Sequence, residues 1–173
     1  MNQINHEVHE GKYQDIRVLR GGNNIFSDDA NGNRTATKNA LGQETKTLEF
    51  DSTGRALKTQ DANGIISENQ YDATGRLIST TSNANSPNPQ TTTYEYDSVG
   101  RQTKITYPDG SFTQNEYDAA GNLTKTIDQD GNVTENSFDA NGNQIANKIM
   151  DKDGKVLLQS QSVYNNKNQL THL

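Results

Sequence analysis

The stretch Tyr96-Asp97-Ser98-Val99-Gly100-Arg101 decides how this chain is expected to fold, because the chain repeats it. Five clear copies of this aromatic-Asp-x-x-Gly unit occupy residues 50–55, 71–76, 96–101, 117–122 and 138–143. Their aromatic positions are separated by 21, 25, 21 and 21 residues, a weaker copy starts at Asp29, and a decayed copy starts at Tyr164. A period of this length indicates a repeat architecture, in which each unit packs mainly against its neighbours.

A second series of glycines lies between the copies. They follow the motif glycines by 10 or 12 positions, and the two series together contain eleven of the fourteen glycines. The second series comprises Gly42, Gly64, Gly110, Gly131 and Gly154. Asn-Gly and Asp-Gly pairs, which account for four of the five, are strong hairpin signals because both central residues of a two-residue turn adopt positive φ. Turns at this spacing leave strands of about five to seven residues, which predicts an all-β antiparallel β-hairpin repeat array.

The composition leaves two alternatives open. Leu, Ile, Val and Phe make up 17% of the 173 residues, below the level of about 20% at which disorder becomes a real alternative. The net charge of −6, however, is small for a disordered chain of this length. The chain is therefore either unfolded or folded by an architecture that relies on backbone ladders and repetition in place of a large apolar core.

Alternation along the expected strands assigns different residues to the two faces of the sheet. One face carries the motif aromatics and the residues two positions before them, such as Tyr94, Asn115 and Asn136. The other face carries Lys and Glu columns on alternate strands, so neighbouring strands can form ion pairs. Leu77 and Leu123 fall on the Lys side by the same count. We expect ladders of Thr and Asn to fill the inner face, where an ordinary domain would use Leu.

The repeated Asp and Gly residues are expected to build turns. We assign the Asp residues to capping through the turn backbone, and the Gly residues to a left-handed position. The ten residues are Asp51, Gly54, Asp72, Gly75, Asp97, Gly100, Asp118, Gly121, Asp139 and Gly142. Their recurrence in every copy argues against catalysis, since an active site needs one special constellation. Arg55, Arg76 and Arg101 are expected to lie over neighbouring aromatics or to pair with acids.

Several kinds of chemistry are not expected. Because the chain has no cysteine, it can form no disulfide and no thiolate metal site. His6 and His9 are three positions apart, whereas a zinc-binding helix needs a spacing of four and a third ligand. The Asp128 and Asp151 turns resemble half a calcium loop, but Ser137 and Ser160 stand where the loop needs a bidentate carboxylate. We therefore predict no catalytic residue, no metal and no cofactor.

Charge and hydropathy limit the partners further. A pI near 5.0 argues against nucleic acid as the main partner. No apolar run reaches the ~18 residues of a membrane span, so membrane insertion is not expected. The first residues lack the basic flank and apolar core of a signal peptide, and the residues themselves therefore indicate no compartment.

The repeat also carries a family resemblance. The unit Tyr-Asp-x-x-Gly-Arg followed by Pro-Asp-Gly, as in Tyr96 to Gly110, resembles the YD repeats of RHS proteins, which also occur in Tc toxin components and teneurins. The resemblance covers roughly residues 29–168. It implies a YD-repeat sheet spiral, in which many repeats wind into a hollow shell, often around a toxic C-terminal polypeptide that is delivered to competing cells or hosts. A secreted or cell-surface location is implied in the same way.

The sequence departs from the family pattern in its C-terminal part. Family shells close with an Asp-Pro-x-Gly-Leu-like segment where some members cleave themselves, whereas Pro87, Pro89 and Pro108 follow Ser, Asn and Tyr here. The last repeat leaves no room for a cargo, and about a dozen strands of ordinary length are too few for a large cocoon. We expect an open segment of an RHS-type shell that acts as a scaffold. Its protein partners would be the remainder of a shell, an encapsulated toxin, or a second copy paired through sheet edges.

Two segments lie off the repeat grid. Residues 1–27 are expected to form a diverged N-terminal cap or partial repeat, with a hairpin across residues 16–26, before the array of residues 28–173. Residues 82–90 replace a tight turn and are expected to form an exposed loop, which is either a contact site or a neutral insertion.

A carbohydrate or cell-surface binding module is the alternative function. Its residues would be Tyr94, Tyr96, Tyr107 and Tyr117, whose aromatic faces beside amides would suit a glycan. The same tyrosines can instead serve as packing residues, because buried aromatic side chains dominate core energetics. An enzyme is the third alternative and the least supported, because no convergent set of unique residues points to one.

Overall fold

The computed structural model describes the backbone of residues 3–9, 12–18 and 24–172, and the side chains of residues 24–172. All regular elements of these residues are β-strands, so the predicted all-β fold is confirmed. The chain divides into two compact units, Met1–Thr91 and Thr92–Leu173. The predicted division between residues 27 and 28 stays a prediction.

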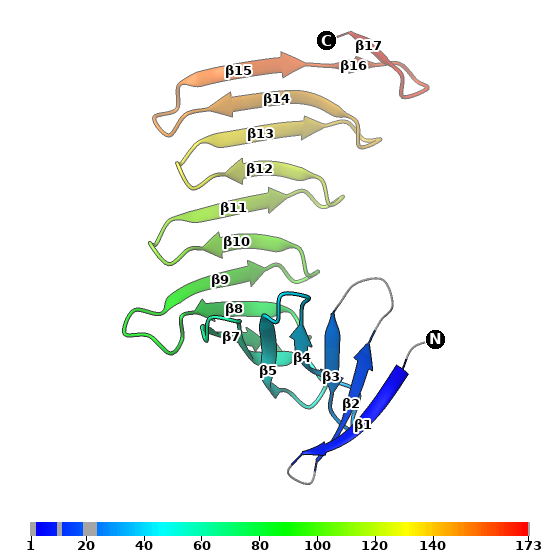
Figure 1. Ribbon diagram of the computed structural model, residues 1–173. Helices are drawn as coiled ribbons and strands as arrows, with labels where there is room; N and C mark the ends of the chain where they lie inside the picture. The colour runs from blue at the N-terminus through cyan, green and yellow to red at the C-terminus, as the bar shows by residue number, and fades with distance from the viewer. Residues whose placement is uncertain (1–2, 10–11, 19–23, 173) are drawn as a thin grey trace. The chain divides into compact units, whose positions relative to one another are not determined.

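The first unit is an antiparallel sheet in which each strand pairs with the next one along the chain (Figure 1). Its strands are β1 (Gln3–His9), β2 (Lys12–Val18), β3 (Ile25–Asp28), β4 (Arg34–Lys38), β5 (Glu44–Phe50), β6 (Ala56–Gln60), β7 (Ile66–Tyr71) and β8 (Leu77–Ser82). The predicted hairpin across residues 16–26 is present in its strands, because Val18 on β2 lies opposite Ile25 on β3. Its turn lies outside the described residues.

The second unit repeats the same arrangement, seen in Figure 1 as the ladder that runs from green to orange. Its strands are β9 (Gln90–Tyr96), which begins in the first unit, β10 (Gln102–Thr106), β11 (Phe112–Tyr117), β12 (Leu123–Ile127), β13 (Val133–Phe138), β14 (Gln144–Met150) and β15 (Val156–Gln161). A separate pair, β16 (Val163–Tyr164) and β17 (Leu170–His172), follows. The antiparallel hairpin array expected from the glycine spacing is confirmed.

One turn geometry accounts for twelve reversals of the chain. Each turn has five residues. The N–H of the first residue donates to the carbonyl of the fifth, and the N–H of the fourth residue donates to the carbonyl of the first, at 2.8–3.1 Å. The fourth residue is glycine in eleven of these turns, with φ between +79° and +95°, and Asn168 in the twelfth, with φ of 57°. This geometry is a three-residue hairpin loop: a type I turn followed by one left-handed residue.

The two-residue turn predicted for the Asn-Gly and Asp-Gly pairs is therefore wrong. That turn requires positive φ at both residues, but the non-glycine residues with positive φ in the described chain are Asn83 and Asn168. Asn63 and Asp109 consequently keep negative φ although each precedes a glycine. The longer loop reverses the chain with a single left-handed residue, and glycine takes that position without a steric penalty.

The returning strands bury one face more than the other, as the alternation predicts. On β11, Asn115 and Tyr117 are half-buried while Glu116 between them is exposed, and β7, β9 and β13 alternate similarly near their ends. The Lys and Glu columns face each other, with Lys58 opposite Glu68 and Lys125 opposite Glu135. The Lys58 Nζ lies 2.6 Å from Glu68 Oε1, so the predicted cross-strand pairing is confirmed.

The face predicted for Leu77 and Leu123 is wrong, because a β-bulge lies beside each of these residues. The register shifts by one residue near the motif turn, and Tyr71 then lies opposite Leu77 and Tyr117 opposite Leu123. Residues directly opposite each other share a face. Both leucines therefore lie on the aromatic face, because the extra residue of the bulge reverses the side-chain count.

The loop that replaces a tight turn after β8 is anchored to the turn beside it. Asn85 accepts a hydrogen bond from the Ile66 N–H at 3.3 Å and donates one to the Gly64 carbonyl at 3.2 Å. The Ala84 N–H also donates to the Ile66 carbonyl at 3.0 Å. Ile66 and Asp28 are the two nearly fully buried side chains among residues 24–172, so apolar packing is sparse.

Candidate functional site

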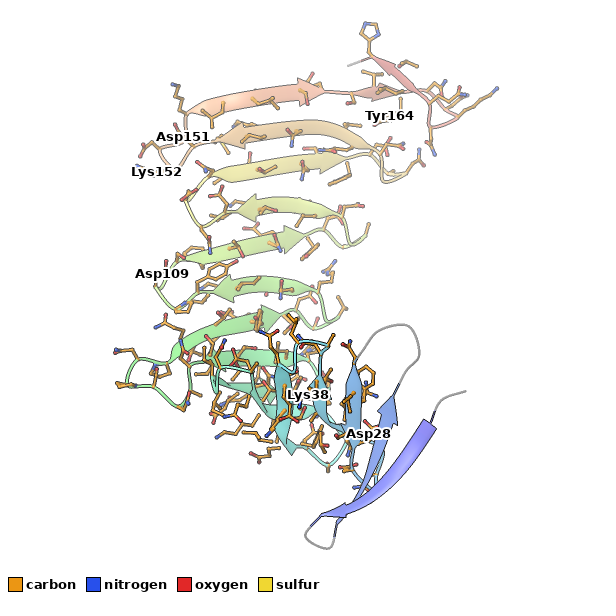
Figure 2. The ribbon with its side chains drawn as sticks, in the orientation of Figure 1. Asp28, Lys38, Asp109, Asp151, Lys152 and Tyr164 are labelled. Atoms are coloured by element: carbon orange, nitrogen blue, oxygen red, sulfur yellow. The ribbon has the colours of Figure 1, made fainter. Side chains whose placement is uncertain are left out.

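In the second unit, the motif turns lie at one end of the strands and the second turns lie at the other end. β9 ends at a motif turn, β10 runs back to a second turn, and the order repeats through β15 (Figure 1). Figure 2 shows Asp109 and Asp151, from two second turns, at the same end of their strands, with Lys152 next to Asp151. The motif turns carry the recurring Asp, Gly and Arg or Asn residues at one end of these strands.

The Asp that opens a motif turn accepts several hydrogen bonds within that turn. Asp72 Oδ1 accepts from the N–H groups of Thr74 and Arg76, at 2.9 and 3.0 Å, and from the Thr74 hydroxyl at 2.7 Å. Asp72 Oδ2 accepts from the Arg76 Nε at 2.7 Å. The structure places Asp51, Asp97, Asp118 and Asp139 at the same position of their turns, where each accepts from the fifth residue.

The fifth residue of a motif turn is Arg or Asn, and both types reach the second carboxylate oxygen. The Arg55 Nε lies 2.6 Å from Asp51 Oδ2, and the Asn122 Nδ2 lies 2.8 Å from Asp118 Oδ2. The expected pairing of arginine with acids is confirmed at all three motif arginines, Arg55, Arg76 and Arg101. These ion pairs close a turn and leave its carboxylate little capacity for an external cation.

The same arginines connect one repeat to the next. The guanidinium of Arg55 lies 4.7 Å from the ring centroid of Tyr71, and that of Arg101 lies 4.6 Å from Tyr117, so the predicted stacking is confirmed at these two positions. The Tyr117 hydroxyl donates to the Gln102 carbonyl at 3.2 Å. The backbone pairing of β10 with β11 begins at Lys104. The Tyr117 hydroxyl therefore donates to a carbonyl that lies outside the backbone ladder of these two strands.

A ladder of amides and hydroxyls crosses the aromatic face, as predicted. The Asn115 side chain donates to the Gln102 carbonyl at 3.5 Å and accepts from the Thr126 hydroxyl at 3.1 Å. The Asn136 side chain donates to the Leu123 carbonyl at 3.1 Å and accepts from the Asn147 amide at 2.9 Å. Hydrogen bonds between strands therefore take the place of an apolar core on this face.

A double-mutant cycle measures the contact between Arg101 and Tyr117. We expect the two changes Arg101→Asn and Tyr117→Leu to be coupled by about 0.5–1 kcal/mol, because the cation lies over the ring at a partly exposed site. Urea unfolding of the four proteins gives this number. Lys125→Asn, on the charged face, is the control partner for Tyr117→Leu, and equal coupling in both cycles would refute a specific stack.

The capping carboxylates predict how stability responds to acid. The Asn122 side-chain amide, followed by its backbone N–H, holds the pKa of Asp118 below its usual range, and Asn143 does the same to the pKa of Asp139. A folded-state pKa below the unfolded value stabilises the fold above the unfolded pKa of about 3.9. That stabilisation is lost as the pH falls from about 4 toward the folded pKa.

Urea unfolding at a series of pH values checks this prediction. We expect the free energy of unfolding to be level near neutral pH and to fall below about pH 4. The double change Asp118→Asn and Asp139→Asn should make the acid limb shallower, because the amide oxygen can still cap without titrating. Asn39 already caps a turn in this way, accepting from the Leu41 and Gln43 N–H groups at 3.0 Å. An unchanged acid limb in the variant would contradict the assignment.

The four tyrosines of the predicted glycan site come from three segments of the second unit. Tyr94 and Tyr96 lie on β9. Tyr117 ends β11, directly before a motif turn, whereas Tyr107 is the first residue of the second turn after β10, at the other end of the strands. The ring of Tyr117 lies against Arg101, and its hydroxyl is bonded to the Gln102 carbonyl. Within the described chain, Tyr117 therefore takes part in contacts between repeats.

Among the hollows formed by the described residues, two serve as examples of features that the sequence pattern did not indicate. One, of about 320 Å³ in the first unit, is lined by Arg34, Ala36, Thr37, Thr45, Lys46, Thr47, Thr59, Gln60, Asp61, Ile65 and Ser67. Its cations are paired, Arg34 with Asp28 at 3.0 Å and Lys46 with Glu44 at 3.2 Å. The other, of about 570 Å³, lies between the motif turns that begin at Asp118 and Asp139. Both are lined by residues from several strands or turns, which alternation along a single strand does not bring together.

The sequence segments considered for metal binding form turns or strands. Asp128 accepts from the Asp130 and Asn132 N–H groups at 3.0 and 2.8 Å, which is the same capping arrangement as in the motif turns. His6 and His9 lie on β1, and their side chains are outside the described residues. Among the described residues, no three His, Asp or Glu side chains are grouped as metal ligands, and no helix is long and apolar enough to span a membrane.

Comparison with known proteins identifies the repeat. The family model described as the teneurin YD-shell matches residues 22–172. Among solved structures, the chain is similar to TcdB2-TccC3-Cdc42, with 16% identity over 98% of this chain and 14% of that chain and a TM-score of 0.30. It is also similar to TcdB2-TccC3, with 15% identity over 92% of this chain and 13% of that chain and a TM-score of 0.40. It is also similar to the Photorhabdus luminescens Tc holotoxin pore, with 17% identity, 96% and 13% coverage and a TM-score of 0.31. The chain thus spans 13–14% of the length of these proteins, and no curated protein matches it.

Proposed function

Because the chain belongs to the teneurin YD-shell family, we propose that it is a structural segment of an RHS-like shell in a secreted toxin system. One observation carries the proposal: the side chains of the motif are bonded within their own turn and to the next repeat. The Arg101 side chain, for example, contacts Asp97, Tyr117 and the Asp118 carbonyl. Such contacts stabilise a wall and leave few free groups for chemistry, so no catalysis is assigned to the chain.

The shell role implies protein partners. We infer that they are further YD repeats of the same wall and a polypeptide that the wall encloses. The family match supports wall formation, since one-dimensional arrays gain stability from each neighbouring unit. A secreted or cell-surface location belongs to the same proposal.

Native purification with limited proteolysis tests this role. The chain is recovered from the cells that produce it and treated with protease before and after mild denaturation. A shell segment should be recovered in a β-rich, protease-resistant particle together with further YD repeats, and an enclosed polypeptide should become sensitive only after denaturation. Recovery as a free protein with no enclosed polypeptide would overturn the proposal.

Glycan binding is the alternative proposal and has weaker support. Its tyrosines lie on β9, at the end of β11 and at the start of the turn after β10, and Tyr117 already contacts Arg101. A glycan array with the wild-type chain and the Tyr96→Ala variant distinguishes the two functions. Binding that Tyr96→Ala abolishes, with the fold retained by circular dichroism, would favour the binding module over the shell.

A further inference from the structure

The motif turn that begins at Asp118 ends in an asparagine, whereas the motif turn before it ends in an arginine. In that earlier turn, the guanidinium of Arg101 lies 4.6 Å from the centroid of the Tyr117 ring. Its Nε donates to Asp97 Oδ2 at 2.6 Å, and its Nη1 donates to the Asp118 carbonyl at 3.2 Å. A single arginine thus joins two successive motif turns and the aromatic residue before the second. One repeat later, Asn122 stands at the corresponding position.

The space that an arginine would fill after Asn122 is open. The Asn122 side chain closes its own turn, with Nδ2 2.8 Å from Asp118 Oδ2. The hollow of about 570 Å³ lies beyond it and is lined by both motif turns and by Phe138. Within the part of the chain whose side chains are described, no cationic group lies over the Phe138 ring, while Tyr71 and Tyr117 each carry a guanidinium.

The hollow offers the same kinds of group that the arginine of the preceding repeat contacts. These are an aromatic ring, a carboxylate and the first carbonyl of a motif turn, supplied by Phe138, Asp118 and Asp139. Asp118 Oδ2 accepts one bond from Asn122, and the Asp139 carbonyl accepts one from the Gly142 N–H at 3.0 Å. An oxygen of either kind has a second lone pair, so each can accept another hydrogen bond.

The charge of the lining also favours a cation. The lining contains the carboxylates of Asp118 and Asp139, and no Lys, Arg or His is among the described residues that form it. Asn122 and Asn143 hold the pKa of these two carboxyls below the usual range, so both are charged at neutral pH. A planar guanidinium can stack on a ring while its N–H groups donate in the plane, whereas an ammonium is a compact and strongly hydrated charge.

We propose that this hollow binds the guanidinium of an arginine side chain from a partner polypeptide. The guanidinium stacks on the Phe138 ring and donates to the Asp118 carboxylate and the Asp139 carbonyl, as Arg101 does one repeat earlier. The turn residues Ala119, Ala120, Ala140 and Asn141 are exposed, so a long flexible side chain reaches the hollow while the backbone of the partner stays outside it. This inference does not depend on the shell role, because it rests on contacts within the second unit.

Titration with N-acetyl-arginine amide, followed by ¹H–¹⁵N NMR, tests the site. The backbone N–H signals of Asn122 and Gly142 should shift and saturate, because these groups donate to the Asp118 carboxylate and the Asp139 carbonyl. The affinity should be in the millimolar range, since a single side chain makes the contact. The Gly100 signal is the internal control, because Arg101 already closes that turn.

N-acetyl-citrulline amide provides the chemical control, since it has a similar shape but no charge. It should leave the signals of Asn122 and Gly142 unchanged. The proposal is overturned by equal shifts with the citrulline compound, by equal shifts at Gly100, or by no shift with the arginine compound.

Asn122→Arg supplies the missing cation from within the chain. The new side chain should lie over Phe138 and abolish binding of N-acetyl-arginine amide without lowering the thermal melting temperature. Asn132→Arg is the matched control, because Asn132 closes a turn in the same way at the other end of the strands, with Nδ2 2.9 Å from Asp128 Oδ2. It should bind like the wild type. Binding retained by folded Asn122→Arg, or lost in folded Asn132→Arg, would refute the site.

Discussion

Gly54→Ala should lower the free energy of unfolding by about 1 kcal/mol more than Gly32→Ala. Both glycines occupy the fourth position of a motif turn, with φ of +83° and +84°, so both variants force alanine into the left-handed region at a penalty of about 1–2 kcal/mol. The surroundings differ. A Cβ at Gly54 would lie 2.5 Å from Asn33 Oδ1, whereas a Cβ at Gly32 meets no atom within 4 Å.

The excess has a specific structural source that can be removed. Asn33 is held by its hydrogen bond to Asp29 Oδ2 at 3.0 Å, so it cannot move away from the new methyl group without breaking that bond. Urea unfolding in the Asn33→Ala background should therefore show Gly54→Ala and Gly32→Ala to be equally destabilising. A persistent difference in that background would mean that the stacking of Asn33 on the next turn is not the cause.

Asn136→Leu should destabilise the fold by about 2 kcal/mol, roughly twice the effect of Asn115→Leu. The Asn136 side chain donates to the Leu123 carbonyl and accepts from the Gln144 and Asn147 amides, at 3.1, 2.7 and 2.9 Å. Leucine has a similar size but cannot form these hydrogen bonds, so the partly buried Leu123 carbonyl and Asn147 amide and the exposed Gln144 amide each lose a partner. At the control position, the Gln102 carbonyl keeps its bond from the Tyr117 hydroxyl at 3.2 Å when Asn115 is replaced.

A rescue experiment separates this explanation from a simple packing defect. The motif aromatic beside Asn136 is Phe138, which has no hydroxyl to offer the Leu123 carbonyl. Adding Phe138→Tyr to Asn136→Leu should recover part of the lost stability in chemical denaturation, because the new hydroxyl can reach the carbonyl as in the Tyr117 repeat. Equal effects of Asn136→Leu and Asn115→Leu, with no rescue, would refute the role of the carbonyl.

The architecture could be predicted because glycine spacing is a local signal with a direct consequence. Each motif glycine occupies a position that reverses the chain, and the residues between reversals are too few for anything but short strands. The Lys and Glu columns followed from simple alternation, and the register places Lys58 opposite Glu68 as that alternation requires. These features depend on residues close together in the sequence.

The features that were missed depend on backbone geometry between strands. A count of alternating positions assumes an unbroken strand, so it placed Leu77 on the wrong face of a bulged one. The turn type was wrong for a related reason, because Asn63-Gly64 is compatible with two loops, and the hydrogen bonds from the Asn63 and Ile65 N–H groups to Asp61 favour the longer one. The positions of Tyr107 and Tyr117 at opposite ends of their hairpin likewise follow from the strand order, which composition does not indicate.

The contact between successive turns has a consequence for how such a chain can be rearranged. Arg55 and Arg101 precede repeats that carry Tyr71 and Tyr117, whereas Asn122 precedes one that carries Phe138. Among the five clear copies, an arginine is followed by a tyrosine repeat and an asparagine by a phenylalanine repeat. Units cut out and rejoined in another order would bring an arginine to a phenylalanine or an asparagine to a tyrosine. A shuffled library should consequently be enriched, after selection for solubility, in junctions that preserve the native neighbours.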